Sequence, residues 1–98
     1  MHSLAIQDVN LSNILKTMMG EKKVNAHTVA GMCEITYQTV KNVLDGKSPN
    51  ARFVKLVVAH FGLNNDPDFL RRILVAYLLL QFPEDDGELL KKAGILDG

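Results

Sequence analysis

Four polar side chains recur at helical spacing near the middle of this 98-residue chain. They are Tyr37, Gln38, Lys41 and Asn42. On a helix, residues three and four positions apart share a face, so all four would lie on one outer surface. The amides of Gln38 and Asn42 can each make two hydrogen bonds to adenine, and Lys41 can donate to guanine or to a phosphate. Such a face can read base edges in double-stranded DNA, although the same side chains also suit an ordinary solvated helix.

Further hydrogen-bond donors flank this segment. Lys47, Ser48, Asn50 and Arg52 follow it, and His27 precedes it. Donors in these places can bind phosphates and fix the position of a protein on DNA without reading its sequence. A plain polar loop is the alternative. Tyr37 itself could stack on a ring, donate to a phosphate or only cover the start of its helix.

Two short helices would position these residues. Thr36 is a suitable N-cap for a helix over 37–44, and Asn25 can likewise cap a helix from 26 to 32 or 33. Two short helices joined by a tight turn, the second with a polar outer face, have the geometry that places a helix in the major groove. The sequence therefore predicts a helix-turn-helix motif at about 26–46.

Apolar residues at helical spacing predict the remaining elements. We expect helices over 10–19, from Ser48-Pro49 to about 61, and over 88–93. Asp66-Pro67 is a further start signal, for a fifth helix that would carry Phe69 to about Gln81. The length suits one hydrophobic core. We therefore expect one all-α domain over residues 1–98, with five helices and a short additional C-terminal helix.

A set of small, apolar and glycine positions in this region resembles the lambda repressor/Cro-like (Xre-type) helix-turn-helix family. The matching positions are Val29-Ala30, Cys33, Ile35-Thr36, Val40, Val43, Asp45-Gly46-Lys47 and Pro49, within about 14–63. The resemblance implies a five-helix lambda repressor-like DNA-binding domain whose second and third helices form the motif and whose dimers bind pseudo-palindromic operators. Tyr37 and Gln38 would then reach base edges. Lys41 and Asn42 would reach bases or phosphates one turn later.

Three positions depart from this family pattern. Glu34 stands in the turn where members often have glycine, so it either takes a left-handed conformation or forms a different turn. Ala26 replaces a phosphate-binding glutamine, which leaves only its backbone N–H for that contact. Leu44 replaces an acid, and it suits apolar packing instead.

Charge is distributed unevenly along the chain, although the formal net charge is zero. Residues 13–62 carry seven basic and three acidic side chains, a net charge of +4, and the rest of the chain carries −4. This asymmetry favours contact between one half of the protein and a polyanion.

No pattern of catalytic or metal-binding residues accompanies this charge. His2, His27 and His60 lack the spacing of a zinc site, and we predict no metal and no cofactor. Cys33 falls on an inward helical position and no glycine-rich phosphate loop is visible, so we do not expect an enzyme. The longest apolar run, 73–80, is too short to cross a bilayer, and one cysteine suits a reducing compartment. We expect a cytoplasmic protein without membrane contact.

The helix predicted over 69–81 is apolar around almost its whole circumference. A surface helix needs only one apolar stripe, so a second buried face is implied. We expect the C-terminal segment, about 66–96, to form a homodimer. The residues expected in that interface are Ile73, Tyr77, Leu78 and Leu79. The alternative is a core helix covered by the acidic C-terminal segment.

These features predict a sequence-specific, double-stranded DNA-binding transcriptional regulator, a homodimeric repressor of phage or mobile-element type. Two alternatives remain open. The chain could be the antitoxin of a toxin-antitoxin pair, or a protein-interaction adaptor that keeps the fold without binding DNA. A protein partner, either an antirepressor or a toxin, is compatible with the first two readings.

Overall fold

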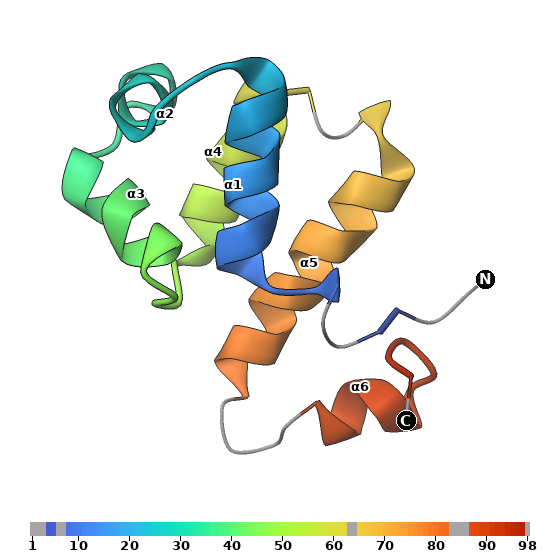
Figure 1. Cartoon of the computed structure of the whole chain (residues 1–98). Coiled ribbons are helices and arrows are strands. Elements are labelled where there is room, and N and C mark those ends of the chain that lie inside the picture. The colour runs from blue at the N-terminus through green and yellow to red at the C-terminus, as the bar shows by residue number, and fades with distance from the viewer. Residues whose placement is uncertain (1–3, 6–7, 63–64, 83–86, 98) are drawn as a thin grey trace.

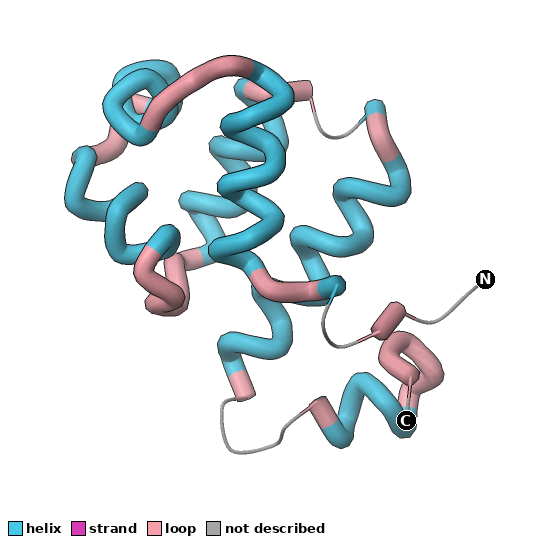
Figure 2. The backbone as a smooth tube through the Cα atoms, in the orientation of Figure 1, coloured by secondary structure: helices cyan, strands magenta, loops and turns pink. Residues whose placement is uncertain are grey.

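Six α-helices make up most of the part of the chain that the computed structural model describes (Figure 1). The structure describes residues 4–5, 8–62, 65–82 and 87–97. The helices are α1 (Leu11–Lys22), α2 (Ala26–Cys33), α3 (Tyr37–Leu44), α4 (Ala51–His60), α5 (Pro67–Gln81) and α6 (Glu88–Lys92). Figure 2 shows that short loops join the first four helices. The predicted all-α fold, five helices with a short additional C-terminal helix, is confirmed.

Side-chain caps set the start of α1 to α5. In each case the residue before the helix accepts a hydrogen bond from a backbone N–H three positions later, which satisfies a donor that the helix itself leaves unpaired. The caps are Asn10, Asn25, Thr36, Asn50 and Asp66. The predicted caps Asn25 and Thr36 are therefore confirmed.

The end of α1 lies later than predicted. The helix runs through Gly20 to Lys22, and Lys23 closes it with a left-handed φ of 57°. The N–H of Val24 bonds to the carbonyl of Met19 at 3.0 Å, and the Val24 side chain packs against the core. A helix commonly ends in this way when the apolar residue beyond it is drawn inward. The packing of Val24, rather than the glycine, sets the end.

The start of α4 also lies later than predicted. Asn50 accepts a hydrogen bond of 2.9 Å from the N–H of Phe53, so the helix begins at Ala51. Asparagine is at least as good an N-cap as serine, and it displaces Ser48 from that role. Pro49 therefore lies in the loop between α3 and α4, which is longer than the sequence predicted.

The first five helices each bury one face in a common hydrophobic core. α1 packs against α3 and α5, α2 packs against α3 and α4, and α4 packs against α5. In Figure 1, α1 lies at the centre of the view, with α2 and α3 on one side and α5 on the other. The largest fully buried side chains are Leu15, Met18, Val29, Cys33, Val40, Val43, Phe53, Val57 and Ile73. Because both motif helices contribute to this core, their orientation is fixed by packing.

The two ends of the described chain meet beside α6. Leu4 and Leu96 form an isolated parallel bridge, and both side chains are buried. The N–H of Leu4 bonds to the carbonyl of Ile95, and the N–H of Asp97 bonds to the carbonyl of Leu4, each at 2.8 Å. Residues 93–95 lie beside the first half of α5. The C-terminal segment is thus fixed to the start of the chain.

Candidate nucleic-acid interface

The turn between α2 and α3 depends on the backbone of Glu34. This residue has φ 55° and ψ 43°, in the left-handed region that residues other than glycine rarely enter. The N–H of Ile35 bonds to the carbonyl of Ala30 at 3.0 Å, and the Ile35 side chain packs against the core. Glu34 therefore takes the conformation that a glycine would supply, and the turn is tight.

α3 presents a polar face because its apolar residues point into the core. Val40 and Val43 are buried where α3 packs against α1 and α2. The four predicted reading residues lie at the surface, with Tyr37, Gln38 and Lys41 exposed and Asn42 half-buried. The structure thus brings all four together on one short helix.

The C-terminal end of α3 is held by α1. The Ser12 hydroxyl donates a hydrogen bond to the carbonyl of Leu44. The Leu44 side chain is partly buried against the core, as its apolar character predicted. These contacts fix both ends of α3, since Thr36 caps its start.

The two amide side chains on the polar face of α3 bond to each other. Gln38 Nε2 donates to Asn42 Oδ1 at 2.9 Å, across one helical turn. This bond leaves Gln38 Oε1 as an acceptor and Asn42 Nδ2 as a donor. Adenine presents the complementary N6 donor and N7 acceptor in the major groove. The two residues can therefore act as one adenine-binding unit.

The rings of His27 and Tyr37 stack on each other. Their centroids lie 4.1 Å apart and their planes differ by 10°. His27 is the second residue of α2 and Tyr37 is the first residue of α3, so the contact joins the starts of the two motif helices. The sequence does not indicate this contact, because only the geometry of the turn brings the two rings together.

The loop between α3 and α4 carries the predicted phosphate-binding residues. Lys47, Ser48, Asn50 and Arg52 are all exposed. Asn50 uses its Oδ1 to cap α4, which leaves its amide N–H groups as donors. The Ser48 hydroxyl accepts a hydrogen bond of 2.8 Å from Gln81 Nε2 at the end of α5. The hydrogen bond between Ser48 and Gln81 joins segments that are distant in the chain, and no local sequence pattern could predict it.

α5 has one buried side and one exposed apolar ridge. Ile73, Val75 and Ala76 lie in the core. The other side carries the α5 ridge, which consists of Leu70, Leu74 and Leu78 at four-residue spacing. Two of its side chains are well exposed, with values of 44% for Leu74 and 38% for Leu78. Phe82, just beyond the end of the helix, is 43% exposed. The apolar circumference of this helix therefore exceeds what the core covers.

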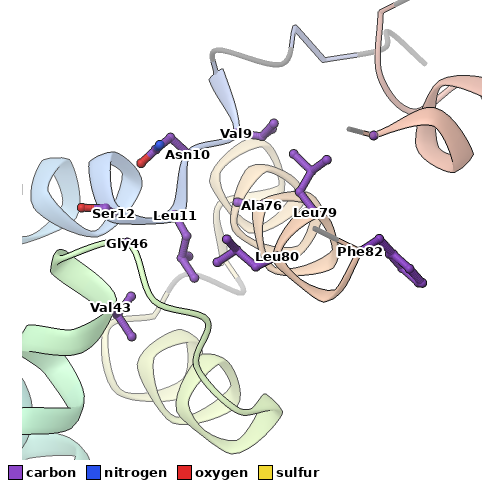
Figure 3. Close-up of a pocket in the computed structure, with 11 residues that line it drawn as sticks. Val9, Asn10, Leu11, Ser12, Val43, Gly46, Ala76, Leu79, Leu80 and Phe82 are labelled. Atoms are coloured by element: carbon purple, nitrogen blue, oxygen red, sulfur yellow. The ribbon is translucent and has the colours of Figure 1, made fainter. Parts of the chain in front are cut away.

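The predicted dimer residues divide between these two sides. Ile73 is 1% exposed, so it is a core residue and its assignment to an interface is corrected. Tyr77 and Leu79 are partly buried, and Leu79 lines a cavity of about 390 Å³ between α1, α3 and α5 (Figure 3). Of the four predicted residues, Leu78 alone lies on the α5 ridge. Leu74 was missed, although the four-residue repeat through Leu78 contains it.

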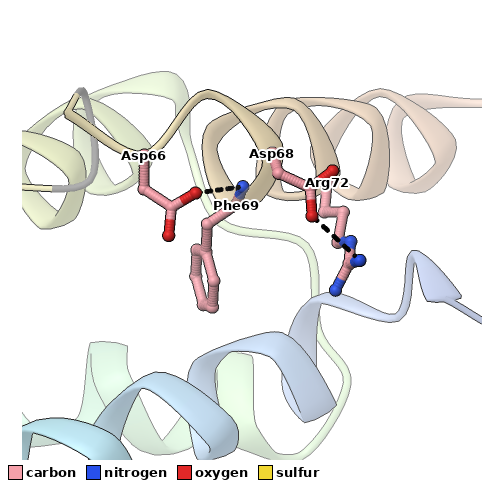
Figure 4. Close-up of polar contacts among 4 residues, drawn as sticks. All are labelled: Asp66, Asp68, Phe69 and Arg72. Carbon is pink, nitrogen blue, oxygen red and sulfur yellow. Dashed lines mark hydrogen bonds and ion pairs between the residues drawn. The ribbon is translucent and has the colours of Figure 1, made fainter.

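The basic side chains near α3 have no acidic partner in the part of the chain that the structure describes. Among the residues that the structure describes, no ion pair involves Lys41, Lys47 or Arg52. On α5, by contrast, Arg72 pairs with Asp68 at 3.0 Å (Figure 4). Cations without a carboxylate partner remain available to neutralise phosphates.

Cys33 lies on the inner side of α2 and is 1% exposed. Burial raises the pKa of its thiol, because the interior disfavours the thiolate. Within the described ranges, no group of three or more His, Cys, Asp or Glu residues could hold a metal ion. None of the helices in those ranges is long and apolar enough to cross a membrane.

Comparisons with models of known protein families, with curated proteins and with solved structures find no match to this chain. It is an all-helical protein in which two short helices meet at a tight turn and the second exposes a polar face.

Proposed function

We propose that this chain is a sequence-specific, double-stranded DNA-binding transcriptional regulator of the lambda repressor/Cro-like (Xre-type) family. The observation that carries the proposal is the outer face of α3. There Tyr37, Gln38, Lys41 and Asn42 share one side of a helix whose other side is packed into the core. The major groove admits a helix of this kind, and its base edges offer partners for these side chains.

Different parts of the surface would have different tasks. The first residues of α3 would lie nearest the base edges, where the pair Gln38 and Asn42 suits adenine. Lys47 and Arg52 would bind phosphates and fix the register of the protein on the duplex. The backbone N–H of Ala26, at the start of α2, offers a further phosphate contact.

The α5 ridge supports a homodimer. Leu74 and Leu78 expose apolar side chains one turn apart on α5. A two-fold mate that used the same ridge would cover these side chains in a self-complementary interface. Gln81 contacts Ser48, so the end of α5 adjoins the phosphate-binding loop. A dimer joined there would present two copies of α3 to successive major grooves of a pseudo-palindromic operator.

Repression follows from the same arrangement. A dimer that occupies an operator excludes other proteins from that stretch of DNA without any enzymatic activity. We therefore extend the proposal to a cytoplasmic repressor of phage or mobile-element type, as the family resemblance implies.

The α5 ridge also favours a second candidate function. An apolar strip can bind a different protein instead of a second copy, and an antitoxin would use it to grip a toxin. An antirepressor could bind the same ridge. A chain that is monomeric alone, yet forms a stoichiometric complex with the product of a neighbouring gene, would support this candidate.

Duplex binding at several salt concentrations tests the proposed function. Fluorescence anisotropy would compare a labelled duplex pool with the corresponding single strands. We expect preference for the duplex, and an affinity that falls linearly on a plot of log affinity against log salt. A chain that binds neither form, or binds both equally, would contradict the proposal and leave the adaptor alternative.

A further inference from the structure

A ring contact joins the two motif helices on the surface proposed to face DNA. The imidazole of His27 lies parallel to the ring of Tyr37, with centroids 4.1 Å apart. We propose that His27 is a positioning residue, which holds Tyr37 so that its hydroxyl reads a base edge at the start of α3. This role rests on the proposed DNA-binding function.

The stack restrains a side chain that is otherwise open to solvent. Tyr37 is 41% exposed, and its ring stacks on the ring of His27. An exposed tyrosine in the first turn of a helix can sample several rotamers, and ordering it on binding lowers affinity. Contact with His27 selects one orientation before DNA arrives. The expected benefit is preorganisation of the tyrosine.

The place of Tyr37 on α3 favours a base edge over a phosphate. Tyr37 and Gln38 are the first two residues of the helix, and the N-terminal residues of a recognition helix contact the bases. The tyrosine hydroxyl can both donate and accept a hydrogen bond. It can therefore bond to N7 or O6 of guanine or to the N6 amino group of adenine. A phosphate oxygen only accepts, so a phosphate contact would use the tyrosine hydroxyl as a donor alone.

His27 would act through Tyr37 rather than mainly through a contact of its own. Its imidazole nitrogens form no hydrogen bond within the described part of the chain, so a direct phosphate contact is the competing explanation. Phenylalanine at this position keeps a flat ring for stacking and removes both nitrogens. His27→Phe therefore separates the two explanations.

The ring contact is tested first in the free protein. We expect nuclear Overhauser effects between the ring protons of His27 and Tyr37 in the full chain, and their loss in His27→Ala. A folded wild-type chain without these signals would overturn the inference, whatever DNA it binds.

A double-mutant cycle then tests the effect on DNA binding, using the best duplex from in vitro selection. His27→Ala should weaken that complex about two- to tenfold, and much less when Tyr37 is already alanine. His27→Phe should restore most of the affinity. His60→Ala is the matched control, because His60 is an exposed histidine at the opposite end of α4 from the phosphate-binding loop.

Tyr37→Phe identifies the partner of the hydroxyl. Loss of preference at one base pair supports base reading, whereas equal weakening of all sequences indicates a phosphate and overturns the proposed role. The proposed role would also be overturned if the affinity losses of the His27→Ala and Tyr37→Ala variants simply added in the double variant. It would likewise be overturned if the His27→Phe variant bound as weakly as His27→Ala. A wild-type chain that binds no duplex refutes the proposed function itself. Duplex binding with uncoupled rings refutes only this inference.

Discussion

Gln38 donates a hydrogen bond of 2.9 Å to Asn42, one turn further along the polar face of α3. Each amide therefore orients the other, and the loss of either one frees its partner to rotate. We expect Gln38→Ala and Asn42→Ala each to weaken binding to the best operator by about 1–3 kcal/mol and to relax preference at particular base pairs. The double variant should lose less than the sum, because the two residues share one interaction.

Anisotropy titrations of the parent, both single variants and the double variant measure this coupling, and circular dichroism confirms that each is folded. Folded single variants that bind the selected duplex as tightly as the parent would show that α3 is not the reading helix.

Lys47 and Arg52 are expected to act on all DNA sequences alike. Both are exposed, and neither forms an ion pair within the described residues, so each can neutralise a phosphate. Replacement of either residue by alanine should weaken binding to all duplexes alike and leave sequence preference intact. The slope of log affinity against log salt concentration should become less steep by roughly one. Lys92→Ala on α6 is the charge-matched control. A variant that lost preference at one base pair but kept its salt slope would contradict a phosphate role.

The α5 ridge should control self-association. Leu74→Lys and Leu78→Glu, made separately, place a charge that the monomer exposes to water but a dimer would bury without a partner. We expect monomers of unchanged helicity and a large loss of operator affinity, because each half-site loses its tethered mate. Ile73→Ala provides the contrast, since a core truncation should lower stability by about 2–5 kcal/mol.

Light scattering with circular dichroism distinguishes these outcomes. If the parent is already monomeric at tens of micromolar, the ridge is not a dimer interface. That result would favour the antitoxin alternative. If both ridge variants unfold, the ridge belongs to the core.

Replacement of Glu34 by glycine should stabilise the fold. The left-handed φ of 55° at Glu34 disfavours any residue with a Cβ by about 1–2 kcal/mol, while glycine loses more chain entropy on folding. The net expectation for Glu34→Gly is a gain of about 0.5–1 kcal/mol in the free energy of unfolding. Glu34→Ala keeps the Cβ and removes the charge, so it is the control. Urea denaturation measures both, and a destabilised glycine variant would mean that the turn has another conformation.

Local signals made the motif helices predictable from the sequence. Asn25 and Thr36 cap α2 and α3 with their own side chains, and the inward positions Val29, Val40 and Val43 repeat at helical spacing. Such signals lie within a few residues of one another. Both helices therefore have the predicted boundaries.

Features that depend on tertiary contacts were not predictable in this way. The end of α1 depends on where Val24 packs, and the sequence pointed instead to Gly20. Ile73 and Leu74 are adjacent and similarly apolar, and only the positions of the other helices decide which one is buried. The Ser48–Gln81 hydrogen bond likewise requires the assembled fold.

In vitro selection from a random duplex pool at moderate salt tests the central claim most directly. We predict enrichment of an inverted repeat whose half-sites lie about one helical turn apart, because a two-fold dimer would present its two α3 helices to successive major grooves. The enriched positions should change in the Gln38 and Asn42 variants. Selection that enriches no sequence, or enriches only single-stranded nucleic acid, would contradict the proposal that this protein is a duplex-reading regulator.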